Sequence, residues 1–190
     1  DLHLRLRRQR QMCIRDSIMA QLKDQMVPFL TAEEIAETVA ELAGQIEADY
    51  DGKEVVFICP LRGSVHFTAD LMRKIDLPQQ VDFVHVQAVE RGGAIKIVKD
   101  ISVNIAGKHV LIVEEIIDTG RTLSFLRSRL FASAPASLKI VTLLDKPARR
   151  ELPIKADYIG KTIDDRYVVG YGMDSEEIGR NYPDIYTMKN

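Results

Sequence analysis

Short apolar runs alternate with amphipathic stretches along most of this chain. Runs rich in Val, Ile and Leu occupy residues 55–59, 110–113 and 139–144. The first two are apolar at every position and the third at all but Lys139 and Thr142, as a parallel strand buried on both faces requires. Apolar residues recur at helical spacing over residues 31–50, 64–75 and 123–131. This alternation predicts an α/β domain with a mainly parallel sheet flanked by helices.

The expected helices have recognisable boundaries. Thr31 is a capping residue followed by acidic residues in the first turn, and the periodic pattern ends near Tyr50. Residues 60–63 read as a turn between a strand and the helix at 64–75. Four apolar residues of that second helix are available for its buried side: Val65, Ala69, Leu71 and Met72.

Other segments predict strands at the margins of the domain. Residues 81–86 alternate apolar and polar positions, as a strand at a solvated edge would, and residues 95–98 fit a hairpin partner across the glycines of residues 90–93. Residues 158–160 and 167–172 are β-rich and contain glycine. A small β-rich hood is expected beside the main sheet.

Length and composition narrow the class of protein. The 190 residues, 46% hydrophobic and 28% charged, fit one soluble globular domain, and no apolar run approaches the roughly 18 residues of a membrane span. A formal charge of −2 gives no overall basic field for nucleic acid. The two cysteines, Cys13 and Cys59, cannot form a disulfide framework, and Cys59 closes an apolar run, so a buried thiol in a cytoplasmic protein is expected.

The first 17 residues differ from the rest. They carry five arginines, which interrupt every apolar stretch, and a net charge of +3. We therefore expect residues 1–17 to be a basic extension outside the fold and residues 18–190 to form a single domain.

The chemistry concentrates after the apolar run at residues 110–113. Asp118, Thr119, Gly120, Arg121 and Thr122 follow it at the carboxyl end of a central strand, where open α/β sheets bind ligands. Backbone N–H groups, two threonine hydroxyls and the positive end of a helix dipole are suited to one phosphate group. The alternative is a solvated acidic turn before a capped helix.

Two acids precede this loop. Glu114 and Glu115 are poor partners for phosphate, so their expected partners are the hydroxyls of a ribose or a divalent cation. Three strand ends, at residues 60–64, 114–122 and 145–146, are expected to meet at one edge of the sheet and to form a site for a phosphorylated sugar.

Three segments carry a resemblance to a known family. They are Val-Leu-Ile-Val-Glu-Glu-Ile-Ile-Asp-Thr-Gly-Arg-Thr-Leu at 110–123, Leu-Leu-Asp-Lys-Pro-Ala-Arg-Arg at 143–150 and Val-Val-Gly-Tyr-Gly-Met-Asp at 168–174. Through them the chain resembles the purine phosphoribosyltransferases that act on hypoxanthine and guanine, over roughly residues 27–189. The resemblance implies the type I phosphoribosyltransferase fold and transfer of a phosphoribosyl group from phosphoribosyl pyrophosphate to a 6-oxopurine, with Mg²⁺.

The resemblance also implies roles for individual residues. Asp118 would be the general base near purine N7, and Lys146 would donate to purine O6. Tyr167 would stack on the base and the backbone of Val168 would read its exocyclic position. Four groups of residues would bind phosphoribosyl pyrophosphate. Its pyrophosphate would lie against Leu61, Arg62 and Gly63, in a turn whose peptide is often cis in the family, and against Arg180. Its ribose would contact Glu114 and Glu115, and its 5′-phosphate would be bound by Thr119, Gly120, Arg121 and Thr122. Asp174 would lie beside the purine and the metal, with Glu114 and Glu115 as the other metal ligands.

Read without the resemblance, several of these residues have ordinary explanations. Arg62 fits an exposed surface turn, Lys146 fits a solvated lysine beside a proline, and Tyr167 fits a core tyrosine. Asp174 and Arg180 fit a pair of surface charges.

The chain departs from the family pattern at two places. Glu115 stands where the family usually has aspartate, which lengthens that acid by one methylene. Residues 85–94 lack the Ser-Tyr pair of the family's closing loop, so poorer exclusion of water is expected.

Other functions remain open from sequence. These are a xanthine-preferring enzyme and a non-catalytic, nucleotide-sensing regulator on the same fold. The expected assembly is a homodimer or homotetramer, with no nucleic acid or membrane partner.

Overall fold

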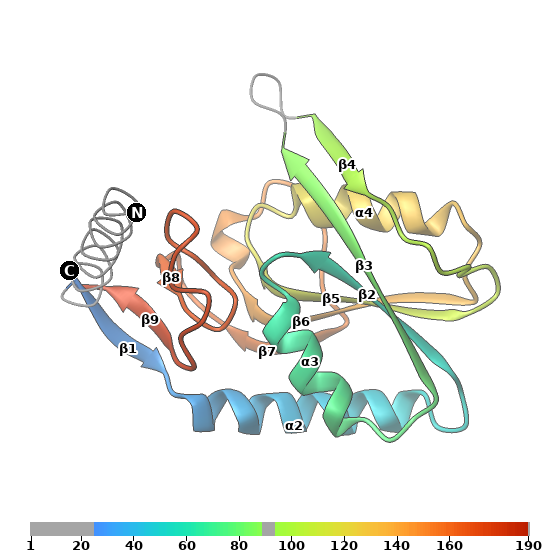
Figure 1. Cartoon of the computed structure of the whole chain (residues 1–190), viewed down its shortest axis with the longest axis horizontal. Helices are drawn as coiled ribbons and strands as arrows, with labels where there is room; N and C mark the ends of the chain where they lie inside the picture. The colour runs from blue at the N-terminus through green and yellow to red at the C-terminus, as the bar shows by residue number, and fades with distance from the viewer. Residues whose placement is uncertain (1–24, 89–93, 190) are drawn as a thin grey trace, which may run out of the picture.

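The computed structural model describes residues 25–88 and 94–189, and its centre is a six-stranded sheet (Figure 1). The strand order is β4-β3-β2-β5-β6-β7, and all neighbours are parallel except β3 and β4, which pair antiparallel. The strands are β2 (Val55–Leu61), β3 (Gln79–Ala88), β4 (Ile95–Lys99), β5 (His109–Ile117), β6 (Ser137–Asp145) and β7 (Tyr158–Thr162).

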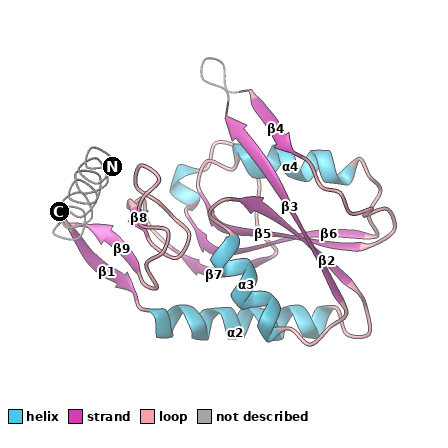
Figure 2. Cartoon of the chain, in the orientation of Figure 1, coloured by secondary structure: helices cyan, strands magenta, loops and turns pink. Residues whose placement is uncertain are grey.

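Helices cover both faces of this sheet (Figure 2). On one face α2 (Ala32–Asp49) and α3 (Val65–Lys74) pack against side chains such as Phe57 and Leu111. On the other face α4 (Arg121–Phe131) packs against Ile58 and Ile112. Consecutive side chains of a strand point to opposite faces, so strands apolar at every position are buried on both sides.

The first helix begins at the capping residue that the sequence indicates. Thr31 Oγ1 accepts the Glu34 N–H at 3.2 Å, and the Glu34 carboxylate accepts the Thr31 N–H at 2.8 Å. Tyr50 follows the last helical residue. This reciprocal pair is a capping box, and it satisfies two backbone donors that a helix start otherwise leaves without partners.

A separate three-stranded antiparallel sheet forms the hood (Figure 1). Its order is β1 (Met26–Leu30), β9 (Ile185–Met188) and β8 (Val168–Val169). Asp184 Oδ1 accepts the N–H of Ala32 at the start of α2 at 2.8 Å, and the Tyr171 hydroxyl donates to Asp70 of α3 at 2.6 Å. These bonds attach the hood to the helices beside the sheet.

Most of the expected elements are confirmed, including the hairpin of β3 and β4. Three expectations are wrong in detail. Pro60 and Leu61 belong to strand β2 and not to the turn. The outermost strand is β4, so β3 is not an edge strand. Val65 and Ala69 are exposed, and the buried side of α3 consists of Phe67, Thr68 and Leu71.

The remaining expectations concern the cysteine, membrane spans, the N-terminal extension and the loop between β3 and β4. Cys59 is fully buried, and burial raises the pKa of its thiol to about 12, so the buried-thiol expectation is confirmed. Among the described residues no helix is long and apolar enough to cross a membrane. The basic extension at 1–17 lies outside the described residues, as does the glycine-bearing part of the loop between β3 and β4, at 89–93.

Candidate active site

Adjacent strands deliver the predicted residues to one edge of the sheet. β2, β5 and β6 are neighbours and run parallel, so their carboxyl ends lie together. The Lys146 N–H, just past β6, donates to the carbonyl of Ile117 at the end of β5 at 3.0 Å. The expected convergence of the three strand ends is therefore present in the structure.

The loop after β5 forms an anion-binding geometry. Gly120 has φ +81° and immediately precedes α4, and the Arg121 N–H lies 3.4 Å from Thr119 Oγ1. Arg121 and Thr122 form the first turn of α4, where backbone N–H groups have no partners within the helix. The side chain of Arg121 forms an ion pair with Glu151. The loop thus offers backbone donors and a helix N-terminus to one anionic group.

Glu114 and Glu115 form a coupled acid pair at the end of β5. Burial raises the pKa of Glu114, and the charge and hydrogen bond of Glu115 raise it further. Burial also raises the pKa of Glu115, although the bond from Glu114 and the charge of Arg180 oppose this. Glu115 Oε2 is buried and has no hydrogen-bond partner in the part of the chain that the structure describes. The two carboxylates lie close together, and one of their oxygens has no hydrogen-bond partner. This arrangement favours binding of a cation or of a group that donates a hydroxyl hydrogen bond.

The turn after β2 packs directly against the acid pair and the hood. The peptide between Leu61 and Arg62 is cis, as the resemblance implies. A Cβ on Gly63 would lie 1.8 Å from Glu115 Oε1, and a Cβ on Gly172 would lie 1.9 Å from the Gly63 carbonyl oxygen. Gly172 therefore requires glycine, because its added Cβ would meet a backbone oxygen at a φ of +100°, whereas a side chain at position 63 would have to displace the Glu115 carboxylate.

Ion pairs connect this turn to the loop that precedes β9. Arg62 pairs with Glu177, and Glu177 lies 3.2 Å from Arg180. Arg180 Nη2 is 2.7 Å from Asp174 Oδ1, and its Nη1 donates to the Gly172 carbonyl at 2.8 Å. Arg180 Nε is buried and has no partner among the residues described. Asp174 and Arg180 thus belong to a network that includes the turn, and are not isolated surface charges.

The predicted metal ligands do not all come together. No group of three or more His, Cys, Asp or Glu residues suited to a metal occurs among the described residues. Asp174 Oδ1 is engaged by Arg180, and its Oδ2 accepts the Glu177 N–H at 2.8 Å. Only Glu114 and Glu115 remain close and available. Mg²⁺ binds through one or two carboxylates and substrate phosphates, so the acid pair fits this ion if the substrate supplies the other oxygens.

Asp118 has a partner that the sequence did not indicate. Its Oδ1 accepts from Arg149 Nε at 3.0 Å, and its backbone carbonyl accepts from Arg150. The Asp118 side chain is 44% exposed, so it remains accessible from solvent. The loop and the segment after β6 are therefore held together by both arginines.

The residues expected to contact a purine lie in different environments. Lys146 is only 7% exposed, so it is not a solvated surface lysine. Tyr167 is 52% exposed, which excludes the core tyrosine, and its hydroxyl donates to the Asp174 carbonyl at 3.2 Å. Val168 is buried in β8. An exposed aromatic face and a buried amine are compatible with binding of an aromatic base.

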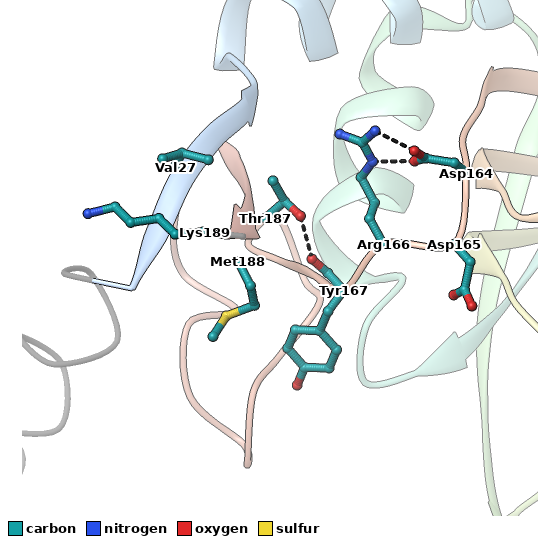
Figure 3. Close-up of a pocket in the computed structure, with 8 residues that line it drawn as sticks. All are labelled: Val27, Asp164, Asp165, Arg166, Tyr167, Thr187, Met188 and Lys189. Atoms are coloured by element: carbon teal, nitrogen blue, oxygen red, sulfur yellow. Dashed lines mark hydrogen bonds and ion pairs between the residues drawn. The ribbon is translucent and has the colours of Figure 1, made fainter.

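A hollow of about 680 Å³ lies beside Tyr167, in the hood (Figure 3). Residues from β1, β9 and the segment before β8 line it, and Arg166 pairs with Asp164 at its margin. Of the predicted purine contacts, Tyr167 alone is among the residues that line it. The hollow therefore adjoins the strand-end site without coinciding with it.

Sequence reasoning missed three residues of this site. Arg149 lies within the segment at 143–150 that carries the resemblance, but the sequence indicates no role for it, nor the packing of Gly172 or the ion pair of Glu177. The Gly-Tyr-Gly pattern at 170–172 was the available signal for the close approach, since φ at Gly172 is +100°. Nothing local in the sequence indicates the partners of Arg149 and Glu177.

Comparisons with known proteins agree with this geometry. A family model described as phosphoribosyl transferase domain matches residues 29–176. A hypoxanthine-guanine phosphoribosyltransferase of Staphylococcus aureus is 44% identical over 165 residues, which cover 85% of this chain and 92% of the relative.

Solved structures give the same result. A hypoxanthine-guanine phosphoribosyltransferase of Bacillus anthracis, with HEPES in its active site, is 44% identical and superposes with a TM-score of 0.83, covering 87% of this chain and 99% of that one. A hypoxanthine phosphoribosyltransferase of Staphylococcus aureus is 42% identical with a TM-score of 0.86, covering 90% and 95%. The chain therefore belongs to the phosphoribosyltransferase family and, within it, to the hypoxanthine-guanine phosphoribosyltransferases.

Proposed function

We propose that the protein is a purine-salvage enzyme. It transfers the 5-phosphoribosyl group of phosphoribosyl pyrophosphate to hypoxanthine or guanine, and forms IMP or GMP and pyrophosphate. The observation that carries this proposal is the meeting of an acid pair, an anion-binding loop and a buried lysine at adjacent strand ends. Each group has a counterpart on the substrates: ribose hydroxyls, a 5′-phosphate and the oxygen of a 6-oxopurine.

Phosphoribosyl pyrophosphate is bound through three parts of the edge. The 5′-phosphate accepts bonds from the backbone of residues 119–122 and lies at the N-terminus of α4. The ribose hydroxyls donate to Glu114 and Glu115. The pyrophosphate lies against the turn at Leu61, Arg62 and Gly63, where Arg180 supplies positive charge if substrate displaces its contact with Asp174 or Glu177.

A divalent cation, for which we propose Mg²⁺, fits the acid pair. When bound, it would neutralise charge that develops on the leaving pyrophosphate. Glu114 and Glu115 are its proposed protein ligands, because Asp174 is already engaged by Arg180 and the Glu177 N–H. Asp174 instead holds Arg180 in place.

Asp118 is the proposed base for the attacking nitrogen. It follows β5 directly and lies between the acid pair and the phosphate loop. In the free protein Arg149 donates to its carboxylate, so the purine must approach beside or displace this guanidinium. A carboxylate that accepts a proton as the new C–N bond forms would assist transfer by general-base catalysis.

Lys146 and Tyr167 are proposed to select and hold the base. An ammonium group can only donate hydrogen bonds, so Lys146 favours an oxygen at purine C6 over an amino group. The exposed ring of Tyr167 offers a stacking surface, and the Val168 backbone and Asp174 lie next to it. We also propose a cytoplasmic homodimer or homotetramer, as the family resemblance suggests.

The test is a base panel. The protein is mixed with Mg²⁺, phosphoribosyl pyrophosphate and one of hypoxanthine, guanine, xanthine or adenine, and nucleotide is followed by chromatography. The proposal expects high kcat/KM for hypoxanthine or guanine and low kcat/KM for adenine. Xanthine in first place would favour the xanthine-preferring alternative, and equal use of adenine would contradict the role of Lys146.

A further inference from the structure

The connection between β6 and β7 differs from the other parallel crossovers of the sheet. α3 connects β2 to β3 and α4 connects β5 to β6, but the β6–β7 connection contains only a short 3₁₀ turn, Pro147–Arg149, as its regular element. A helix in a crossover normally covers the sheet face. Here a cavity of about 720 Å³ lies between α4, β6, β7 and residues 147–157.

The cavity has an apolar wall and a charged margin. Leu138, Ile154, Ala156 and Ile159 supply apolar surface from β6, β7 and the connection. An apolar wall of this kind suits a ring or short alkyl chain, and the volume is in the range of small-molecule sites, roughly 300–1,000 Å³.

Two of the cations at the margin are free to bind a ligand. Arg127 of α4 and Lys155 of the connection both line the cavity, and neither has an ion pair or hydrogen bond within the described part of the chain. Arg150 is paired with Asp145, and the Asp157 carboxylate accepts the Ile140 N–H at 2.8 Å. Three cations against two carboxylates leave a net positive charge, and both carboxylates already have partners.

The cavity lies behind the phosphate loop. A Cβ on Gly120 would be 2.6 Å from Ile154 Cγ2 and 3.1 Å from Arg150 Cδ, and both residues line the cavity. Arg150 also donates to the carbonyl oxygen of Asp118. One wall of the cavity is thus the support of the loop that we assign to the 5′-phosphate.

We propose that this cavity is a second ligand site, for a small organic anion with an apolar ring or chain. The apolar part lies against Leu138, Ile154 and Ile159, and the anionic group is bound by Arg127 and Lys155. The site is distinct from the substrate site, because it lies on the far side of the residues that support the phosphate loop.

The experiment uses 1-naphthoate as the probe and the isoleucine methyl signals of the full chain as the readout. Titration should shift the Ile154 and Ile159 signals with saturation. Arg127→Ala and Lys155→Ala should each weaken binding about twofold to fivefold, since each removes one exposed charge contact. Lys74→Ala, which removes an exposed cation from α3, should leave the affinity unchanged. The neutral analogue 1-naphthalenemethanol should bind more weakly than 1-naphthoate.

A second titration with saturating GMP separates this site from the substrate site. Under the proposed function GMP occupies the strand-end site, and 1-naphthoate should still shift Ile154. Complete displacement by GMP, absence of the Ile154 shift, or an affinity equal to that of the parent protein in both Arg127→Ala and Lys155→Ala would overturn the inference. Binding of 1-naphthoate is measured without turnover. The result therefore tests the second site whether or not the protein catalyses phosphoribosyl transfer.

Discussion

Asp118 is the residue on which the proposed chemistry depends most. Asp118→Asn keeps an oxygen that can accept from Arg149, so the ion-paired loop should retain its shape, but an amide cannot take up the proton. We expect kcat to fall by roughly two to four orders of magnitude with GMP affinity retained. Steady-state kinetics and a GMP titration measure both.

The matched control for this variant is Asp165→Asn. Asp165 lies 3.8 Å from the same Arg149 but is not assigned to the site, so its substitution should leave kcat near that of the parent. Near-normal turnover in Asp118→Asn, or equal losses in both variants, would remove Asp118 from the role of base.

Glu114 is expected to reduce the stability of the free protein. Burial and Glu115 raise its pKa, so the folded state holds its proton more tightly than the unfolded state. Such a group costs nothing below the ordinary carboxyl range, about pH 4, and destabilises the fold progressively as pH rises above it. Glu114→Gln should therefore raise the free energy of unfolding by about 1 kcal/mol at pH 8, with little change at pH 4, and should weaken phosphoribosyl pyrophosphate binding.

Urea denaturation at both pH values tests this. Glu41→Gln, on the exposed side of α2, is the control and should change stability little at either pH. A Glu114→Gln variant that is less stable than the parent at pH 8 would show that the Glu114 carboxylate does not destabilise the fold.

The local chemistry of the site was predictable, but its long-range contacts were not. The acid pair, Asp118 and the phosphate loop follow one strand, so their proximity is fixed by the backbone. Arg149 meets Asp118 across 31 positions of sequence, and Glu177 meets Arg62 across 115. Such contacts depend on how separate elements pack, and a single sequence carries no local signal for them.

At the scale of elements, the turn after β2 lies so close to the loop between β8 and β9 that position 172 should accept only glycine. Gly172→Ala would place Cβ 1.9 Å from a backbone oxygen at φ +100°, so it should lower stability by at least about 1–2 kcal/mol and reduce activity. Gly44→Ala is the control, since nothing lies within 4 Å of its added Cβ in helix α2. It should stabilise by about 0.5–1 kcal/mol. Thermal unfolding measures the stability of both variants. A Gly172→Ala variant as stable as the parent would contradict this close contact between the two loops.

Asp82 connects β3 to the segment after β4 and should govern acid stability there. Burial alone raises its pKa, but bonds from Lys99, Ser102 and Val103 outweigh burial and hold the pKa well below its ordinary value. A lowered carboxyl pKa stabilises the fold above about pH 4, and this contribution is lost as pH falls. Asp82→Asn should cost on the order of 2 kcal/mol at pH 7 and less at pH 3, by urea denaturation. An equal cost at both pH values would refute the linkage.

Element types followed from sequence more reliably than element orientation. Strands β2, β5 and β6 each contain a run of adjacent apolar residues, which is typical of burial on both faces. For α3 the set of residues expected on the buried side included Leu71, which is buried, but also Val65, which is exposed. The buried stripe contains Phe67 and Leu71, because the path from β2 to β3 sets which side of the helix meets the sheet.

At the scale of the whole molecule, the site exists because the hood and the main sheet are held together. Three contacts join the hood side to the main sheet and its helix α3. They are the Tyr171–Asp70 hydrogen bond, the Arg62–Glu177 ion pair and the Gly172–Gly63 contact. Of the residues assigned to the base, Tyr167 and Val168 come from the hood side, whereas Lys146, the acid pair and the phosphate loop come from the strand ends of the main sheet. Transfer requires both parts in one fixed arrangement.

The most direct test of this account is the stoichiometry of a single reaction. Purified protein, Mg²⁺, phosphoribosyl pyrophosphate and hypoxanthine are combined, and IMP and pyrophosphate are measured over the same time course. We predict that IMP and most of the pyrophosphate form together and depend strongly on Mg²⁺ and on hypoxanthine, with a small excess of pyrophosphate where water replaces the purine. Nucleotide binding without formation of either product would contradict catalysis and favour a nucleotide-sensing regulator.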